Sequence, residues 1–131
     1  MHPLTGTWTA NLEKSKRHAN HQFRQATMHI EVTGTEVRMG YGGVNASGKD
    51  ETGADLIHAD GQAHPHPAAA GLLTTATLDS RSVRIVARQG DAVVGGGAYE
   101  VSDDGQTMTA TVSGTDGSGK PFDQVIVFDR T

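Results

Sequence analysis

The chain has 131 residues, a length typical of a single domain with one continuous core. Its net charge of −4 argues against the clustered Lys and Arg side chains that nucleic-acid binding needs, so we expect no nucleic-acid partner. It contains no cysteine, which excludes disulfides, thiolate nucleophiles and cysteine-ligated metal sites. No apolar run approaches the roughly 20 residues of a membrane-spanning helix, so we expect no membrane association.

The start of the chain and its organisation suggest an intracellular, undivided protein. Residues 1–4 have neither the basic region nor the apolar stretch of a signal peptide. We therefore expect a cytoplasmic protein, unless a leader has been trimmed. No linker or internal repeat divides the sequence, which predicts one domain over residues 1–131. A homodimer is compatible with this sequence.

Segments of strand length follow one another along the whole chain. Many alternate apolar and polar residues, as residues 28–32 and 83–88 do, and this period of two places one face in a core and the other in water. Turn signals such as Asp60-Gly61 separate them, and short connections join antiparallel neighbours. The predicted strands cover residues 5–11, 25–33, 36–42, 50–59, 61–66, 72–78, 82–89, 92–102, 106–114 and 122–130.

Two segments interrupt this pattern without forming a helical domain. Residues 13–24 are polar and have no apolar stripe, so they form at most a short helical turn or lid. Residues 68–71 could hold another turn of helix. Ten antiparallel strands must close or stack, because open edges invite aggregation. We therefore predict an all-β fold, a closed antiparallel β-barrel of about 8–10 strands.

The ends of the chain predict how the barrel closes. Trp8 lies just inside the first strand, and Val125 and Val127 stand with apolar neighbours in the last. We expect these two strands to pair and Trp8 to be buried near one end of the barrel.

The residues expected to point inward predict a cavity. Small residues (Ala54, Gly95, Gly97 and Ala110) accompany few large ones, and aromatic residues make up only 5% of the chain. A barrel of eight or more strands with so little side-chain volume can hold a small ligand. The alternative is a flattened, filled barrel whose glycines mark bulges. The predicted lining consists of Met28, Ile30, Val37, Met39, Tyr41 and either Asp55 or His58.

Several segments resemble one family. Residues 6–16, GTWTANLEKSK, resemble the G-T-W-x-x-N-x-x-K-S start of small bacterial lipocalin-like proteins, within the lipocalin and fatty-acid-binding superfamily. Residues 114–121 and 125–129 are similar to their last hairpin, and residues 103–109 to their penultimate turn. The resemblance implies a lipocalin-like, calycin-type barrel in which Trp8 closes one end. It implies no single function, since the superfamily includes carriers and enzymes.

Residues 50–66 depart from this family pattern. Where such relatives favour Tyr and Lys, this chain has Asp55, His58, His64 and His66. The segment is therefore where we look for chemistry specific to this protein.

Asp55 and His58 are candidate acid–base residues. Burial raises the pKa of a carboxylate, and histidine titrates near neutral pH, so either residue could move a proton. Their odd spacing points them to opposite faces of a strand, so only one should line the cavity. The neighbouring apolar residues do not decide which. Tyr41 and Tyr99 could hold a ligand oxygen, and His29 is a further candidate.

His64-Pro65-His66 has the spacing that places two imidazoles on one side of an extended segment, as zinc and copper sites require. No third ligand stands at convincing spacing, so we predict no metal site and no cofactor.

Two functions are compatible with these features. The first is binding of a small, mainly apolar molecule in the barrel interior. The alternative is a cofactor-free acid–base enzyme, an isomerase, lyase, hydrolase or cyclase, acting on a small organic substrate in the same cavity. In that case Asp55 or His58 moves the proton, while Tyr41 or Tyr99 holds an oxygen.

Overall fold

The computed structural model describes residues 2–16, 23–65, 71–115 and 121–131. Within these ranges all regular structure is β-strand, and no helix is present that could span a membrane. The strands are β1 (Gly6–Lys16), β2 (Phe23–Thr33), β3 (Glu36–Asn45), β4 (Asp50–His58), β5 (Asp60–Pro65), β6 (Leu72–Leu78), β7 (Ser82–Gln89), β8 (Ala92–Val101), β9 (Thr107–Thr115) and β10 (Pro121–Arg130).

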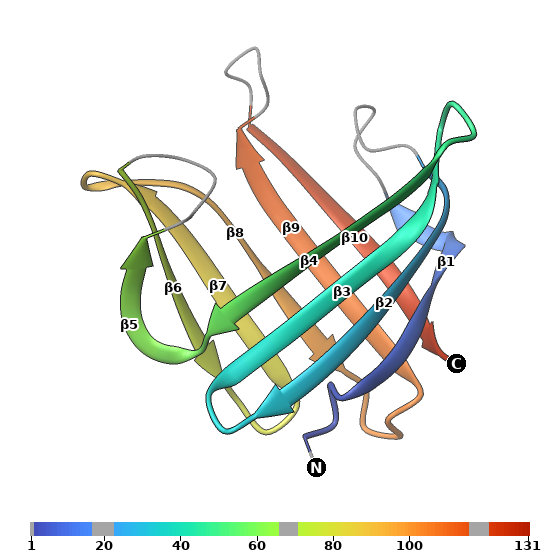
Figure 1. Ribbon diagram of the computed structural model, residues 1–131, viewed down its shortest axis with the longest axis horizontal. Coiled ribbons are helices and arrows are strands. Elements are labelled where there is room, and N and C mark those ends of the chain that lie inside the picture. The colour runs from blue at the N-terminus through green and yellow to red at the C-terminus, as the bar shows by residue number, and fades with distance from the viewer. Residues whose placement is uncertain (1, 17–22, 66–70, 116–120) are drawn as a thin grey trace.

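These ten strands form one curled antiparallel sheet (Figure 1). Its order is β4-β3-β2-β1-β10-β9-β8-β7-β6-β5, so consecutive strands are neighbours except at β4 and β5, and β1 pairs with β10. Trp8 lies opposite Arg130 and Asn11 opposite Val127 in that pairing. The predicted antiparallel barrel and the predicted pairing of the first and last strands are both confirmed.

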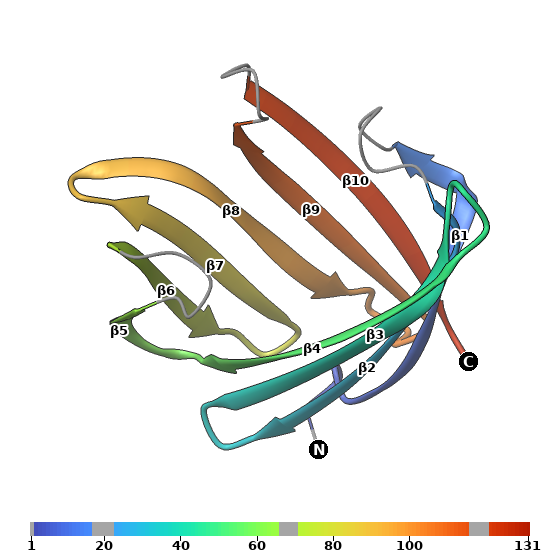
Figure 2. The same ribbon diagram turned by 45° about the horizontal axis from the view of Figure 1, so that its top comes forward.

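The barrel is nearly closed, with one seam between β4 and β5. The two strands follow each other in the chain, yet they stand at opposite ends of the strand order. In the described part of the chain, β4 forms a ladder with β3 alone and β5 with β6 alone. Figure 2 shows the two strands diverging from their shared corner. Each therefore presents a free edge toward the other.

The end of β1 differs from the expectation for residues 13–24. Residues 13–16 continue the strand instead of forming a turn of helix or a lid. The register to β10 shifts between Asn11 and Lys16, and Ser15 bridges the irregularity. Its Oγ donates to the Asn11 carbonyl at 2.7 Å and accepts from the Val127 amide at 2.9 Å. Side-chain hydrogen bonds thus extend a strand that has no apolar alternation.

Helical turns were expected within residues 13–24 and 68–71. Of these segments, residues 17–22 and 68–70 lie outside the described residues. Residues 23 and 24 begin β2.

Trp8 closes one end of the barrel. It is fully buried, and its indole Nε1 donates to the Leu4 carbonyl at 2.9 Å. The guanidinium carbon of Arg130 lies 4.1 Å from the centre of the Trp8 ring, within the range of a cation–π contact.

Arg130 connects three segments of the chain at this end. Its guanidinium donates to the carbonyls of Pro3 at 2.7 Å, Thr5 at 3.1 Å and Gly105 at 2.6 Å. The segment before β1, the last strand and the β8–β9 turn therefore meet over the Trp8 ring.

The packed core lies toward this end of the barrel, and burial decreases along the strands. On β3, Val37 and Met39 are buried, whereas Tyr41, which has the same orientation, is 38% exposed. On β4, Ile57 is half-buried and Asp55 is exposed. Side chains thus fill one end of the barrel and leave the other open.

Replacing Trp8 with Ala should destabilise the protein by ~3–5 kcal/mol, because it removes a large buried ring and leaves a cavity. Chemical denaturation followed by circular dichroism measures this change. Val93→Ala is the control, since Val93 is 62% exposed and should change stability by less than about 0.5 kcal/mol. A loss below about 1 kcal/mol for Trp8→Ala would contradict its role as the closing residue.

Candidate functional site

A cavity of about 870 Å³ occupies the barrel interior beyond the packed core. Its apolar walls include Met39, Ile57 and Ile85, and its polar groups include Tyr41 and Tyr99. Small-molecule sites typically measure ~300–1,000 Å³, so this space can accommodate a small organic molecule.

The pairing of β3 with β4 shows that Asp55 faces this cavity. Asp55 lies opposite Met39, and Met39 lies opposite Ile30 on β2. Opposed residues in a ladder project from the same face of the sheet, so Asp55 shares the inward face of two buried side chains. His58 lies opposite Glu36 and has the other orientation.

Tyr41 and Asp55 form a hydrogen-bonded pair within the cavity. The Tyr41 hydroxyl donates to Oδ2 of Asp55. Gly53, opposite Tyr41, makes room for the ring, since a Cβ at Gly53 would lie 2.6 Å from Tyr41 Cε2. A side chain at position 53 would therefore force the Tyr41 ring to shift.

Tyr99 contributes a second phenol from β8. Burial, followed by the negative charge of Asp55, raises the pKa of Tyr99. The pKa of Tyr41 is raised well above its ordinary value, first by burial and then by the hydrogen bond to Asp55 and its charge. Both phenols are therefore protonated at neutral pH, so each can donate a hydrogen bond.

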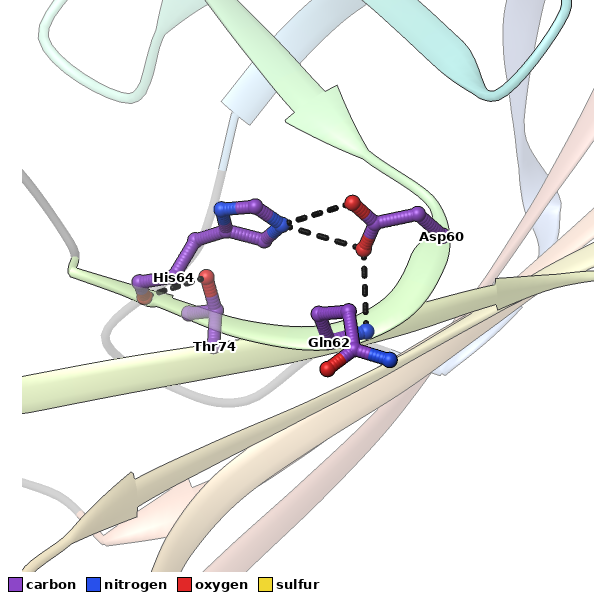
Figure 3. Close-up of polar contacts among 4 residues, drawn as sticks. All are labelled: Asp60, Gln62, His64 and Thr74. Atoms are coloured by element: carbon purple, nitrogen blue, oxygen red, sulfur yellow. Dashed lines mark hydrogen bonds and ion pairs between the residues drawn. The ribbon is translucent and has the colours of Figure 1, made fainter.

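Histidines line the seam between β4 and β5. The ring centres of His58 and His64 are 5.1 Å apart, with the planes tilted by 40°. His64 Nε2 lies 3.0 Å from both carboxylate oxygens of Asp60, and it must be the donor because a carboxylate only accepts (Figure 3). The backbone amide of Gln62 donates to the same carboxylate at 2.9 Å. The hydrogen bond from Gln62, followed by the one from His64, lowers the pKa of Asp60.

The cavity lining includes residues from both strands of the seam, among them His58 of β4 and His64 of β5. Besides the inward residues of β4, it touches Ala54, Leu56 and His58, which have the opposite orientation. The ring of His58 contacts that of His64 across the seam, and both residues line the cavity. The cavity therefore borders the seam beside β4.

The described part of the chain contains no group of three potential metal ligands. His64 lies opposite Thr74, and both line the cavity. Its sequence partner His66 lies outside the described residues, so the expected pair of imidazoles is not observed together.

Other predicted site residues lie elsewhere. His29 is on the outer face, where its Nδ1 lies 2.9 Å from Thr7 Oγ1, so the fold does not bring it together with Asp55. Ala54, expected to point inward, lies opposite Gly40 on the outer face, as His29 does. Met28, Ile30 and Val37 face inward but belong to the packed core, outside the cavity lining.

Sequence reasoning did not predict some of the residues that line the cavity. Ile85, Thr74 and Gln124 line it from β7, β6 and β10. The alternation in residues 83–88 could have identified Ile85. Gln124 is a buried polar residue in an otherwise apolar inward row, a signal that becomes visible only with the strand register.

No protein-family model and no curated protein sequence matches this chain. Solved structures share its fold at low sequence identity. The fluorescent protein UnaG superimposes with a TM-score of 0.63 and 14% identity, over 97% of this chain and 96% of that one. Zebrafish ileal bile acid-binding protein complexed with cholic acid gives 0.62 and 8%, over 98% and 99%. The siderocalin Ex-FABP gives 0.50 and 9%, over 98% and 71%.

These identities are low enough that the likeness concerns the fold alone. The chain therefore has the nearly closed β-barrel of lipocalin-like and fatty-acid-binding-like proteins, as the resemblance in its sequence implied. A bacterial source is not among the features that these structures support.

Proposed function

We propose that this protein binds a small, mainly apolar molecule inside its barrel. The observation that carries this proposal is the cavity of about 870 Å³, whose apolar walls surround a polar centre made by Tyr41, Asp55 and Tyr99. Protein cores are close-packed and contain few voids larger than a water molecule. A space of this size, with a few polar groups converging on it, has the form of a binding site.

The ligand enters laterally through the seam. No ladder joins β4 to β5 in the described residues, so widening the seam breaks no strand pairing. The contact between the His58 and His64 rings spans it instead. Side-chain contacts separate at lower free-energy cost than a row of backbone hydrogen bonds, which makes this the easiest part of the wall to open.

Two of the similar structures support a carrier function by analogy. The bile acid-binding protein is complexed with cholic acid, and the siderocalin functions through dual ligand specificities. Those ligands are properties of those proteins, and the support they lend is that this fold can hold an organic molecule.

The acid–base enzyme receives less support. Both phenols keep their protons at neutral pH because their pKa values are raised, so they act as donors and not as bases. Asp55 already accepts a hydrogen bond from Tyr41. The arrangement is suited to orienting a bound molecule.

Filling the cavity should abolish ligand uptake while preserving the fold. Nile red, a neutral dye that brightens in apolar surroundings, should bind the wild type. Met39→Trp and Ile85→Trp should both lose this signal, because the cavity accepts added volume that a packed core would not. Val93→Trp, on an exposed side chain, is the matched control and should bind normally.

Two results would contradict this proposal. One is a wild-type protein that leaves the dye fluorescence unchanged. The other is unfolding of both Met39→Trp and Ile85→Trp by circular dichroism, which would show that side chains fill the barrel.

The two tyrosines should ionise at higher pH than free tyrosine. They are the only tyrosines in the chain, so tyrosinate absorbance during an alkaline titration reports on both. Because their folded-state pKa values are raised, their contribution to stability is present at neutral pH and is lost as pH rises above about 10. Asp55→Asn should move the titration to lower pH, and an unchanged curve would argue against the Tyr41–Asp55 pair.

A further inference from the structure

We infer that the ligand is an apolar amine, a molecule with a protonated basic nitrogen on an apolar body, held by Asp55 beside Tyr41 and Tyr99. This inference rests on the proposed binding function and specifies the charge of its ligand.

The charges in the cavity favour a cation. Among the described residues that line it, Asp55 is the only carboxylate, and none is Lys or Arg. Arg38 and Arg84 neighbour the inward residues Met39 and Ile85, but both are exposed and alternation places them on the outer face. A ligand carboxylate at Asp55 would therefore meet a like charge with no Lys or Arg among the described lining residues to offset it, whereas an ammonium group would gain a counter-ion.

Asp55 has capacity for such a group. In the described structure its one hydrogen-bond partner is Tyr41, which donates to Oδ2. A carboxylate has about four lone-pair sites on two oxygens, so Asp55 can accept further hydrogen bonds from an ammonium group. The side chain is exposed toward the cavity, so a ligand can reach it.

The two tyrosines strengthen the preference. Both side chains are close enough to Asp55 for its charge to raise their pKa values. An ammonium group at Asp55 would consequently lie near two neutral aromatic rings, whose faces attract cations. A carboxylate ligand would gain nothing from those faces.

Among the described residues, the remaining titratable groups at the cavity are His58 and His64 at the seam, with Asp60 hydrogen-bonded to His64. A protonated imidazole would oppose a cationic ligand. Binding is therefore measured at about pH 8, above the range in which imidazoles ordinarily gain a proton.

The test is displacement of Nile red by sets of molecules that share one apolar body and differ in their polar end group, which is cationic, neutral or anionic. One trio is decylamine, decanol and decanoate, and a second has naphthylethylamine, naphthylethanol and naphthylacetate, which separates charge from shape. In at least one trio the amine should displace the dye at about tenfold lower concentration than the alcohol, with the acid weakest. High salt should reduce the advantage of the amine and leave the alcohol unchanged.

Variants locate the effect. Asp55→Asn should remove the difference between amine and alcohol while the alcohol binds as before. Glu100→Gln removes the same charge from the exposed outer face of β8, next to Tyr99, and should keep the difference.

The inference is overturned if the acid or the alcohol displaces the dye as well as the amine does in both trios. It is also overturned if no amine displaces bound dye, or if Asp55→Asn retains the preference. Should the Asn variant not fold, a salt-insensitive amine preference in the wild type would overturn it equally. Failure of Nile red to bind at all would instead contradict the proposed function.

Discussion

The guanidinium of Arg130, stacked on the Trp8 ring and bonded to the carbonyls of Pro3, Thr5 and Gly105, joins the two ends of the chain. It lies where β1 and β10 pair, in the middle of the strand order. Because the sheet is joined there, its two free edges are β4 and β5, which meet on the other side of the barrel. The pairing of β1 with β10 thus places the seam between β4 and β5.

The packed core and the cavity occupy different parts of the same strands. Along β3, the inward positions pass from Val37 in the core, through Met39 at the border of core and cavity, to Tyr41 at the cavity. The packed end supplies the apolar burial that the fold needs. The open end can then carry groups that a core would exclude, such as the Asp55 carboxylate, without loss of the fold.

The strands could be predicted from the sequence because alternation and turn residues are local signals. Three features could not. Residues 13–16 extend β1 through hydrogen bonds of Ser15, which leave no alternation to detect. The choice between Asp55 and His58 depended on pairing with Met39, a residue on another strand. The seam is the absence of a pairing, and the sequences of β4 and β5 look like those of other strands.

The free edges at the seam also present unpaired backbone groups to other protein molecules, which could add a strand and begin aggregation. Both sides of the seam carry features that oppose this. β5 has only six residues and ends at Pro65, which has no amide hydrogen to donate. Acidic residues, Asp50, Glu51 and Asp55, occur along β4, and their charges repel a second copy of the same strand. The residues along the seam therefore protect the protein against edge-to-edge aggregation.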